Sequence, residues 1–590
     1  MTKATPPTRH ERVAAWIADP ANVSAHQRVA VEHPGDVFLN ACPGSGKTRT
    51  VGVRLAWWSV NPEEIDGQTR PRRIAALSYT NVAVDEIAAA AETAGAPVSE
   101  PDFLGTLHRF LLRYVVRPFG MKCMSCTEPP RLVTDPRTRS ETVSFRDGWV
   151  QRDVSIWDLH HRADGSLVLG ADADVLHETK LNATQIAAKV QQAGRKLKQE
   201  LAAEGLMSFS DAMYWAQRAL EDVEDARAVA ARFDELVVDE AQDTMDTQVR
   251  CLQLLKAAGL RSLVVIGDPN QAIYGFAGAE PVRLEALVAG LGLDGLELTE
   301  NWRSSQQICD SAVEFCERTA ADRAVGPRAD LAVEPELIVY DDGQLRQAVE
   351  IFERRLGELE LTAGKIAVLC RGRGTRDTLN GTGGGVFKGR LADLAELAHA
   401  VQQHETIGAL TVQAIEDELL RHAWPDIVDE ELDETRRVQL RTAVFELASR
   451  LPDTALTAKE WCKQAREATT ATIASLTPTP ATTFKPRTPP GTGALVVADL
   501  LAGRRGALRA RTIHAVKGES YDATLTVAIS TDRFNNVADW LAGGEERRIA
   551  YVALTRAKSY SAVAVPDSCD PSHIAALEAR GFRRLPRTPA

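Results

Sequence analysis

Short apolar runs alternate with helical stretches along much of this chain. The runs lie at residues 37–39, 73–79, 236–238, 263–266, 366–371 and 523–529. Apolar runs of this length, separated by helical patterns, are typical of buried parallel strands that helices connect. The pattern predicts an α/β protein built on parallel sheets.

Two less regular stretches interrupt this pattern, and we interpret both as inserted subdomains. The first, residues 111–205, ends in a helical pattern at 187–204. Arg195, Lys196 and Lys198 form a basic cluster on that helix. We favour a solvated helix face for this cluster over a contact with nucleic-acid phosphates.

The second stretch covers residues 374–506. It contains helical patterns at 415–422 and 431–451 and a Thr/Pro-rich segment at 477–491 that has the composition of a linker. The glycine-rich segment 381–385 has no Lys-Thr after it, so we do not expect it to bind phosphate.

Composition is that of a large globular protein. With 590 residues the chain is too long for one core, and we expect roughly three or four domains. No apolar run could span a bilayer and residues 1–18 lack a signal core, so we expect a cytoplasmic protein with no membrane partner. The net charge of −12 excludes a broadly basic nucleic-acid coat but allows a local basic channel.

The nine cysteines are scattered, and only Cys123 and Cys126 form a C-x-x-C pair. A structural zinc needs four ligands, and no second pair has suitable spacing. We therefore favour a loop with reduced thiols over a zinc site.

The segment A-C-P-G-S-G-K-T, residues 41–48, lies between a predicted strand and a predicted helix at 51–58. A glycine-rich turn in this position aims backbone N–H groups and the positive end of the helix dipole at one point, which suits a phosphate. Lys47 can reach terminal phosphates and the Thr48 hydroxyl can bind Mg²⁺. The usual first glycine of this pattern is Ala41 here. The loop residues of the candidate site are Pro43, Gly44, Ser45 and Gly46.

Asp239 and Glu240 follow the apolar run 236–238. Adjacent carboxylates at the end of a buried strand are costly unless they serve a cation or a proton transfer. We predict that Asp239 holds Mg²⁺ and that Glu240 polarises the water that attacks a γ-phosphate. A solvated loop is the alternative that this position disfavours.

Several polar and aromatic residues follow the other predicted strands. Tyr79 could stack on a base and Thr80 and Asn81 could contact phosphate, although a simple helix N-cap explains the last two equally well. The amide of Gln27 could bind an adenine edge.

Later segments supply further candidates. Gln271 could sense a γ-phosphate, and Tyr274 and Phe276 offer stacking faces close to it. Arg303 is a candidate phosphate clamp beside Trp302, which could stack on adenine.

A second candidate clamp, Arg556, lies on a basic helix predicted at 547–558. We expect Lys558, at the end of that helix, to be solvated.

Taken together, in this order and spacing, the motifs resemble those of superfamily 1 helicases of the UvrD/Rep/PcrA type. The most specific are V-V-D-E-A-Q-D, I-G-D-P-N-Q-A-I-Y-G-F, T-E-N-W-R-S, T-I-H-A-V-K-G and Y-V-A-L-T-R-A-K. The resemblance implies two RecA-like P-loop NTPase domains, each with a largely helical inserted subdomain. The first domain would comprise residues 1–110 and 206–280 with insertion 111–205, and the second 281–373 and 507–587 with insertion 374–506.

The resemblance also implies roles for individual residues, with ATP and Mg²⁺ bound between the domains. Gln27 would bind adenine, which Arg49 and Trp302 would sandwich. Gln271, Arg303 and Arg556 would sense the γ-phosphate. The implied single-strand path is lined by Tyr79, Thr80, Asn81, His108, Tyr274, Phe276 and His514.

This chain departs from the family pattern at several positions. Phe276 is followed by Ala277 where Trp-Arg is usual, and Trp302 replaces a tyrosine. Ser520 replaces the glutamate expected at the ribose, so we assign no ribose contact.

The expected function is an ATP-driven helicase or translocase that acts on single-stranded and partly duplex DNA. Family analogy implies 3′-to-5′ polarity. Two alternatives remain: a motor that strips proteins from DNA without useful unwinding, and a motor subunit paired with a separate nuclease or repair partner, in repair, recombination or phage defence.

Overall fold

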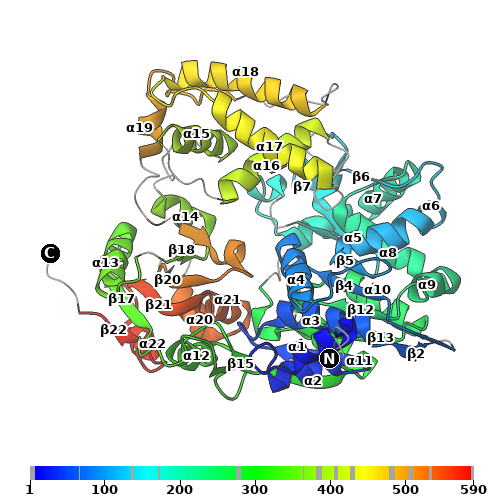
Figure 1. The fold of residues 1–590 in the computed structure, drawn as a ribbon. Coiled ribbons are helices and arrows are strands. Elements are labelled where there is room, and N and C mark those ends of the chain that lie inside the picture. The colour runs from blue at the N-terminus through cyan, green and yellow to red at the C-terminus, as the bar shows by residue number, and fades with distance from the viewer. Residues whose placement is uncertain are drawn as a thin grey trace, which may run out of the picture.

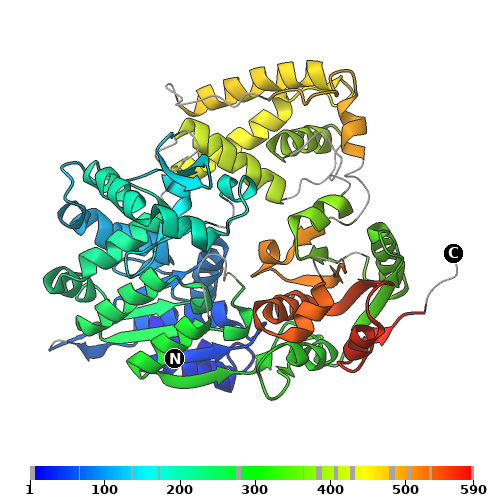
Figure 2. The same cartoon turned by 180° about the vertical axis from the view of Figure 1, so that it is seen from behind.

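Two six-stranded sheets form the body of the protein, and an insertion stands above each (Figures 1 and 2). The computed structural model describes residues 7–65, 67–133, 139–170, 173–273, 281–362, 364–380, 389–403, 409–424, 432, 434–477, 486–502, 508, 510–530 and 535–586. None of the helices in these ranges is long and apolar enough to cross a membrane.

The first sheet is parallel throughout. Its strands, in spatial order, are β14 (Asp294–Leu298), β1 (Val37–Ala41), β13 (Ser262–Gly267), β12 (Glu235–Val238), β4 (Ile74–Ser78) and β5 (Phe103–Thr106). The strands predicted in this half of the chain are thus present. The sheet extends past the expected boundary at residue 280, because β14 pairs with β1.

Helices cover both faces of the first sheet, which explains why its strands are apolar on both sides. Val264 and Ile266 face one layer, and Leu263 and Val265 face the other. The first layer contains α2 (Ala25–Glu32), α3 (Lys47–Val60) and α4 (Asn81–Thr93). The second contains α8 (Phe209–Leu220), α9 (Val223–Ala230), α10 (Asp246–Ala257) and α11 (Pro281–Leu291). Helix α1 (Arg9–Ala18) packs on α3.

The second sheet is also parallel. Its strands, in order, are β19 (Ala510–Thr512), β18 (Ile366–Cys370), β20 (Tyr521–Val527), β21 (Ala557–Pro566), β17 (Glu336–Tyr340) and β22 (Arg583–Arg584). One face packs on α13 (Leu345–Glu358) and α14 (Arg373–Leu379). The other packs on α12 (Gln306–Ala312), α20 (Asn536–Ala542), α21 (Gly544–Leu554) and α22 (Pro571–Glu578). The chain is therefore an α/β protein with parallel sheets flanked by helices.

The predicted helix at 547–558 is wrong at its last four residues, 555–558. Helix α21 ends at Leu554, and the chain turns through Thr555 and Arg556 into β21. The residues from 557 onward form the centre of a sheet, because β21 pairs with both β20 and β17. Lys558 is consequently a strand residue, with its ammonium 3.8 Å from the carboxylate of Asp522.

The first insertion is not largely helical. Between α6 (Arg117–Met124) and α7 (Ala183–Ala203), the described residues form the short strand β6 (Arg131–Leu132) and two antiparallel hairpins. The hairpins are β7 (Thr142–Asp147) with β8 (Val150–Ser155), and β9 (Leu159–His161) with β10 (Leu167–Leu169). Val143, Phe145 and Val154 point into the core beneath α7, and Gly148 makes the turn with φ of +61°. This alternation and a glycine at the first central position of a two-residue turn are hairpin signals.

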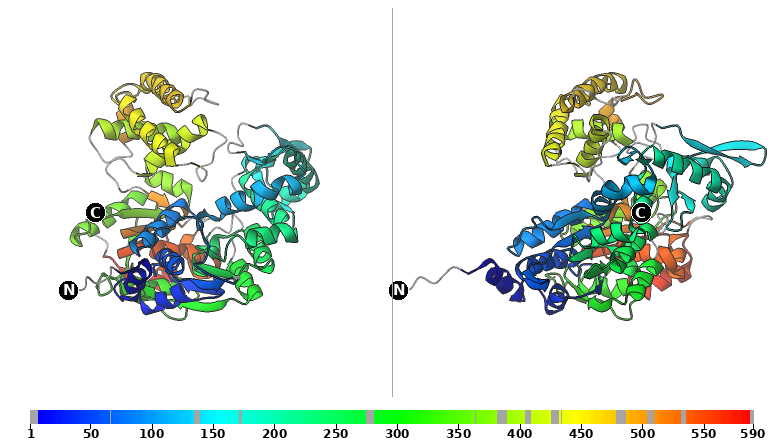
Figure 3. Two further views of the ribbon diagram at one scale, coloured as in Figure 1. Left: turned by 45° about the vertical axis from the view of Figure 1, so that its right-hand side comes forward. Right: turned by 90° about the vertical axis from the view of Figure 1, so that its right-hand side faces the viewer.

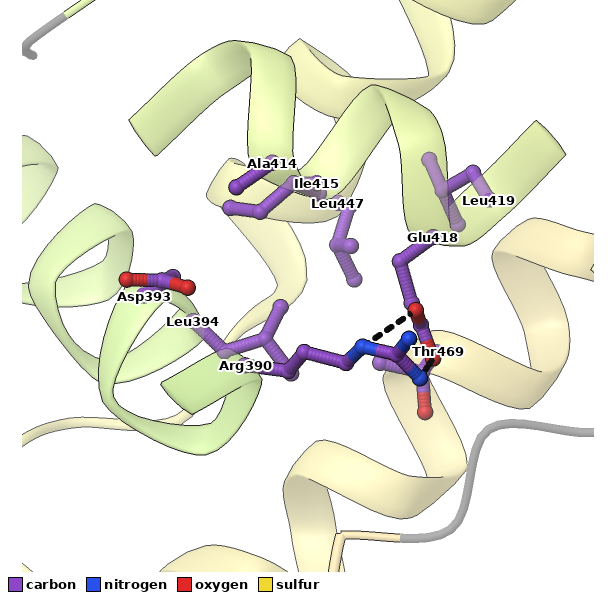
Figure 4. A pocket seen from close by; sticks show the side chains of 9 residues that line it. All are labelled: Arg390, Asp393, Leu394, Ala414, Ile415, Glu418, Leu419, Leu447 and Thr469. Carbon is purple, nitrogen blue, oxygen red and sulfur yellow. Dashed lines mark hydrogen bonds and ion pairs between the residues drawn. The ribbon is translucent and has the colours of Figure 1, made fainter. Parts of the chain in front are cut away.

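The second insertion is helical, as predicted. It contains α15 (Gly389–Gln402), α16 (Ala409–Ala423), α17 (Glu434–Arg450), α18 (Ala458–Leu476) and α19 (Val497–Ala502). They share one apolar core. Figure 4 shows a small cavity among them, beside which Nη1 of Arg390 donates to Oε1 of Glu418 over 2.8 Å. Most of the Thr/Pro-rich segment lies outside the described residues.

Candidate functional site

The glycine-rich loop connects the buried strand β1 to α3. Gly44 and Gly46 both have φ of +79°, a conformation that favours glycine. An added Cβ at Gly44 would lie 2.6 Å from Cβ of Arg303 and 2.6 Å from Oδ1 of Asn301, so no side chain fits there. Ala41, by contrast, is the last residue of β1 and has no positive φ. The loop therefore keeps its shape without the glycine usual at position 41.

Lys47 and Thr48 begin α3 beside the acidic segment that follows β12. Lys47 is buried, with its Nζ 3.4 Å from the carbonyl oxygen of Ala41. Oγ1 of Thr48 donates to Oδ2 of Asp239 over 3.0 Å. The fold thus brings together the residues that the sequence predicts to hold phosphate and metal.

Glu240 has φ of +53°, in the left-handed region that residues with a side chain rarely adopt. Its N–H donates to Oδ1 of Asp239 over 2.9 Å, and the side-chain amide of Gln242 donates to its carboxylate. Unusual backbone of this kind is common at functional sites. Here it turns two adjacent carboxylates toward the phosphate loop.

The two carboxyl groups differ in their charge environment. Burial, and then the neighbouring charge of Glu240, raise the pKa of Asp239. Burial also opposes ionisation of Glu240, but the charges of Lys47 and Lys517 outweigh it and lower the pKa of Glu240. Glu240 is therefore held as a carboxylate that can accept a proton, while a cation beside Asp239 would favour its ionised form.

The Thr48 hydroxyl and the Asp239 carboxylate fit a magnesium ion. Both are oxygen donors, and Mg²⁺ is commonly held by one or two protein oxygens together with water and substrate phosphates. Within the described ranges, no group of three or more His, Cys, Asp or Glu side chains could form a metal cage. Cys123 and Cys126 are free cysteines, and the Cys123 thiol points to the carbonyls of Gly120 and Trp215. Cys123 lies within helix α6, so the predicted loop is wrong at this residue.

Arg303 and Arg556 place two cations beside these carboxylates. Nη1 of Arg303 donates to the carbonyl of Thr555 over 3.0 Å, and Nη2 of Arg556 donates to Oε1 of Gln271 over 3.1 Å. Burial lowers the pKa of both arginines; repulsion from Arg303 lowers that of Arg556 further, whereas the Glu240 carboxylate opposes both shifts. Neither guanidinium has a carboxylate within 4 Å in the part of the chain that the structure describes. A partly buried and a buried cation without counterions form a site for an anion.

Two of the residues expected around adenine, Gln27 and Trp302, contact the glycine-rich loop directly. Nε2 of Gln27 donates to the carbonyl of Ser45 over 2.9 Å, and its Oε1 accepts from the N–H of Ser24. Arg49 lies over the ring of Trp16, 5.7 Å from its centroid. Trp302 is 39% exposed. Its backbone N–H donates to the carbonyl of Gly44 over 2.9 Å. Both functional groups of the Gln27 amide thus already have partners in the protein.

Comparison with known proteins matches residues 23–288 to the family model described as the UvrD/REP helicase N-terminal domain. Residues 23–288 are thus similar to a UvrD/REP helicase N-terminal domain. The matched residues contain the phosphate loop, the acidic segment and Gln271. The resemblance to superfamily 1 helicases of the UvrD/Rep/PcrA type is confirmed.

Curated relatives carry helicase names. DNA helicase II of Escherichia coli is 25% identical over 297 residues, which cover 48% of this chain and 39% of that protein. ATP-dependent DNA helicase PcrA of Staphylococcus epidermidis is 23% identical over 52% of this chain and 41% of its own length. An ATP-dependent helicase/nuclease subunit of Oenococcus oeni is 27% identical over 34% of this chain but only 18% of that protein. The matched region thus covers less than half of each relative.

The first half of the chain exposes part of the predicted DNA-binding set. Tyr79 follows β4 and is 40% exposed. Thr80 is the N-cap of α4, and its hydroxyl accepts from the N–H of Ala83 over 3.3 Å. Asn81 is the first residue of that helix. The capping alternative for Thr80 is therefore present in the structure.

The two predicted histidines are less accessible. Nδ1 of His108 lies 3.3 Å from Nε2 of Gln248, and burial lowers its pKa to about 4. Nε2 of His514 lies 3.0 Å from the carbonyl of Ile273, so a contact joins loops of the two sheets. Tyr274 and Phe276 lie outside the described residues.

Lys517 makes a contact between the halves that the sequence did not predict. Its Nζ lies 2.6 Å from Oδ1 of Asp243 and donates to the carbonyl of Gln271 over 2.7 Å. Burial raises the pKa of Asp243 to about 6 even beside this cation. The signal in the sequence was an acid at the end of V-V-D-E-A-Q-D and a lysine in T-I-H-A-V-K-G, two motifs far apart along the chain.

Arg318 makes a further contact for which the sequence carried no signal. Its Nη1 lies 2.8 Å from Oδ1 of Asp322 and 3.2 Å from Oη of Tyr551, and its Nη2 lies 3.3 Å from Oδ1 of Asp268. Asp268 in turn accepts from Nε2 of Gln271 over 2.9 Å. Arg318 therefore connects the Gln271 turn to the second half of the protein.

Proposed function

We propose that this chain is an ATP-dependent motor that moves along single-stranded DNA and unwinds duplex DNA. One observation carries the proposal: the partly buried Arg303 and the buried Arg556 lie against a phosphate loop and a carboxylate pair that belong to the other sheet. A triphosphate bound at the loop would supply the negative counterion for these two arginines. The UvrD/REP family match supports DNA as the polymer on which the motor acts.

We propose that each parallel sheet is the centre of a RecA-like domain. The first would comprise residues up to 110 and from 206 to about 298, because β14 pairs with β1. The second would comprise about 299–373 and 507–587. Residues 111–205 and 374–506 would be the inserted subdomains. The similar strand arrangement of the two sheets supports this division.

In this proposal the first half binds and activates ATP. Lys47 would neutralise terminal phosphate oxygens, and Thr48 and Asp239 would hold Mg²⁺. Mg²⁺, when bound, neutralises phosphate charge. Glu240 would orient the attacking water and accept its proton, and its lowered pKa keeps the side chain ionised as a carboxylate before that transfer.

The second half would sense the nucleotide state. Arg303 and Arg556 would stabilise charge on the γ-phosphate, and Gln271 would report it to the neighbouring loop through its bond to Arg556. Binding of ATP would draw the halves together and product release would part them, which converts turnover into alternate gripping of DNA. Tyr79, His514 and the residues around them would line the DNA path, and the 3′-to-5′ direction follows family analogy.

The test is an ATPase titration with single-stranded DNA, forked DNA, duplex DNA and RNA, made on wild type and Lys47→Ala. We expect single-stranded and forked DNA to stimulate wild type, and Lys47→Ala to lose turnover while it still binds DNA. Unchanged turnover in Lys47→Ala, or no response to any DNA, would contradict the proposal.

A second candidate is a motor subunit that works with a separate nuclease. The helicase/nuclease name of one relative favours it. Co-purification from the native host would recover a nuclease if this is correct. Comparison of strand displacement with displacement of a bound protein would separate unwinding from stripping of proteins.

A further inference from the structure

The tip of the β7–β8 hairpin carries the most exposed tryptophan in the described part of the chain. Trp149 is 100% exposed, and its neighbour Val150 is half exposed. Figure 3 shows the hairpin, in cyan, reaching away from the rest of the molecule in its right-hand view. A fully solvated indole is unfavourable in isolation, and exposed tryptophans are enriched at binding sites.

The hairpin holds this indole on a well-anchored support. Its strands pair over six positions, from Thr142 with Ser155 to Asp147 with Val150. Val143 and Phe145 are buried against α7. The hydroxyl of Thr179 also donates to the carboxylate of Asp147 and ties the end of β7 to the segment before α7. Little further ordering is therefore needed for Trp149 to bind a ligand.

The outward face of the hairpin is polar. Ser144, Arg146, Gln151 and Asp153 point to solvent, opposite the buried Val143, Phe145 and Val154. Asp153 accepts a hydrogen bond from Ser144, and Ser144 accepts one from Gln151. Protein-binding hot spots usually lie within apolar surroundings, and among the described residues of the insertion only Val150 supplies such a surface near the tip.

The acids beside the tip already have hydrogen-bond or ion-pair partners in the protein. Asp147 is held by Thr179, and Glu178 pairs with Arg152 at 3.3 Å. Arg146 and Lys180 are exposed, and across the described residues neither has a carboxylate within 4 Å. An aromatic face beside unpaired cations is the combination that binds a nucleic-acid strand, with the base stacked and the phosphates facing the cations.

We propose that the hairpin tip is a second nucleic-acid contact, at which Trp149 stacks on a base while Arg146 and Lys180 face the adjoining phosphates. The proposal rests on DNA being the substrate of the motor. The stacked base belongs either to a single strand or to the end pair of a duplex at a fork. In both cases the first insertion would contact DNA at a point outside the proposed DNA path along the two sheets.

The test measures binding of the full-length protein to labelled single-stranded and forked DNA by fluorescence anisotropy, without nucleotide. Stacking on one base is worth about 1–3 kcal/mol, so Trp149→Ala should weaken binding by roughly 5- to 150-fold. Trp149→Phe should recover most of that loss. The matched control is Phe445→Ala, because Phe445 is an aromatic side chain 55% exposed on α17 of the other insertion, and it should bind as wild type.

A loss with both DNAs would assign the stacked base to a single strand, and a loss with forked DNA alone would assign it to the junction. If Trp149→Ala binds both DNAs as tightly as wild type does, the proposal is wrong. A protein partner would then be the remaining ligand for the hairpin tip. Trp149→Ala should keep the ATPase rate measured without DNA. Because the binding assay contains no nucleotide, its result is independent of whether Lys47→Ala abolishes turnover.

Discussion

The two sheets have the same parallel architecture but carry opposite charges to their shared site. The first ends in Asp239, Glu240, Asp243 and Asp268. The second supplies cations: Arg303 beside Glu240, Lys517 on Asp243, and Arg318 on Asp268. Each half buries charges that would be costly without the other. The site is therefore divided by charge, with acids and the phosphate loop in one half and most cations in the other.

The largest effect should come from the acidic half. Glu240→Gln keeps the shape of the side chain and removes the group that accepts a proton from water. We expect ATP turnover to fall by about 10²- to 10⁴-fold, with nucleotide binding retained. Steady-state ATPase and nucleotide-binding assays measure both. Turnover within a few-fold of wild type would show that Glu240 is not the base.

The next effect tests the bond between the halves. Lys517→Met leaves Asp243 buried without its cation, which should lower stability by roughly 3–5 kcal/mol. Thermal unfolding should show a lower midpoint. Adding Asp243→Asn to that variant should restore part of the loss, because the buried charge is gone. An unchanged midpoint in Lys517→Met would mean that the two halves do not depend on this pair.

The pH dependence of stability tests the contact between the halves at Arg318, because Asp322 lies beside that arginine. Burial raises the pKa of Asp322 to about 6, above the ordinary 3.8. A carboxyl group whose pKa is raised by folding stabilises the folded state most below its unfolded pKa, and this contribution is lost as pH rises through the folded pKa. The stability of wild type relative to Asp322→Asn should therefore fall by about 2–3 kcal/mol from about pH 4 to pH 7. Unfolding midpoints of both proteins across this range are the measurement, and a difference independent of pH would contradict the prediction.

The smallest effect is expected at Lys558, which we compare with Arg556, a second cation in the same half of the protein. Arg556 is buried beside Gln271, whereas Lys558 is partly exposed and 3.8 Å from Asp522. Partly exposed ion pairs contribute about 0–1 kcal/mol, so Lys558→Ala should leave stability and turnover nearly unchanged. Arg556→Ala should reduce DNA-stimulated turnover strongly in the same assay. An equal loss of DNA-stimulated turnover in Lys558→Ala and Arg556→Ala would contradict the prediction that only the buried cation serves the site.

Much of the fold could be predicted because buried parallel strands are apolar on both faces. The runs that contain Val264 and Leu525 are examples, and the strand–loop–helix order around Lys47 predicted the phosphate loop. The prediction failed where two patterns overlap. The helical spacing of α21 runs into the alternation of β21 without a glycine or proline between them, so Lys558 was placed on a helix.

Local chemistry could be read from the amino-acid sequence: a glycine loop at Gly44, carboxylates at Asp239 and Glu240, and arginines within recognisable motifs. Which charges meet was set by the packing of the two halves. Arg318 lies 3.3 Å from Asp268 although 50 positions separate them, and Lys517 reaches Asp243 across 274 positions. Periodicity reports which face of an element is buried, because burial is a local pattern. The partner of a buried charge depends on how whole sheets pack, and no local pattern records that.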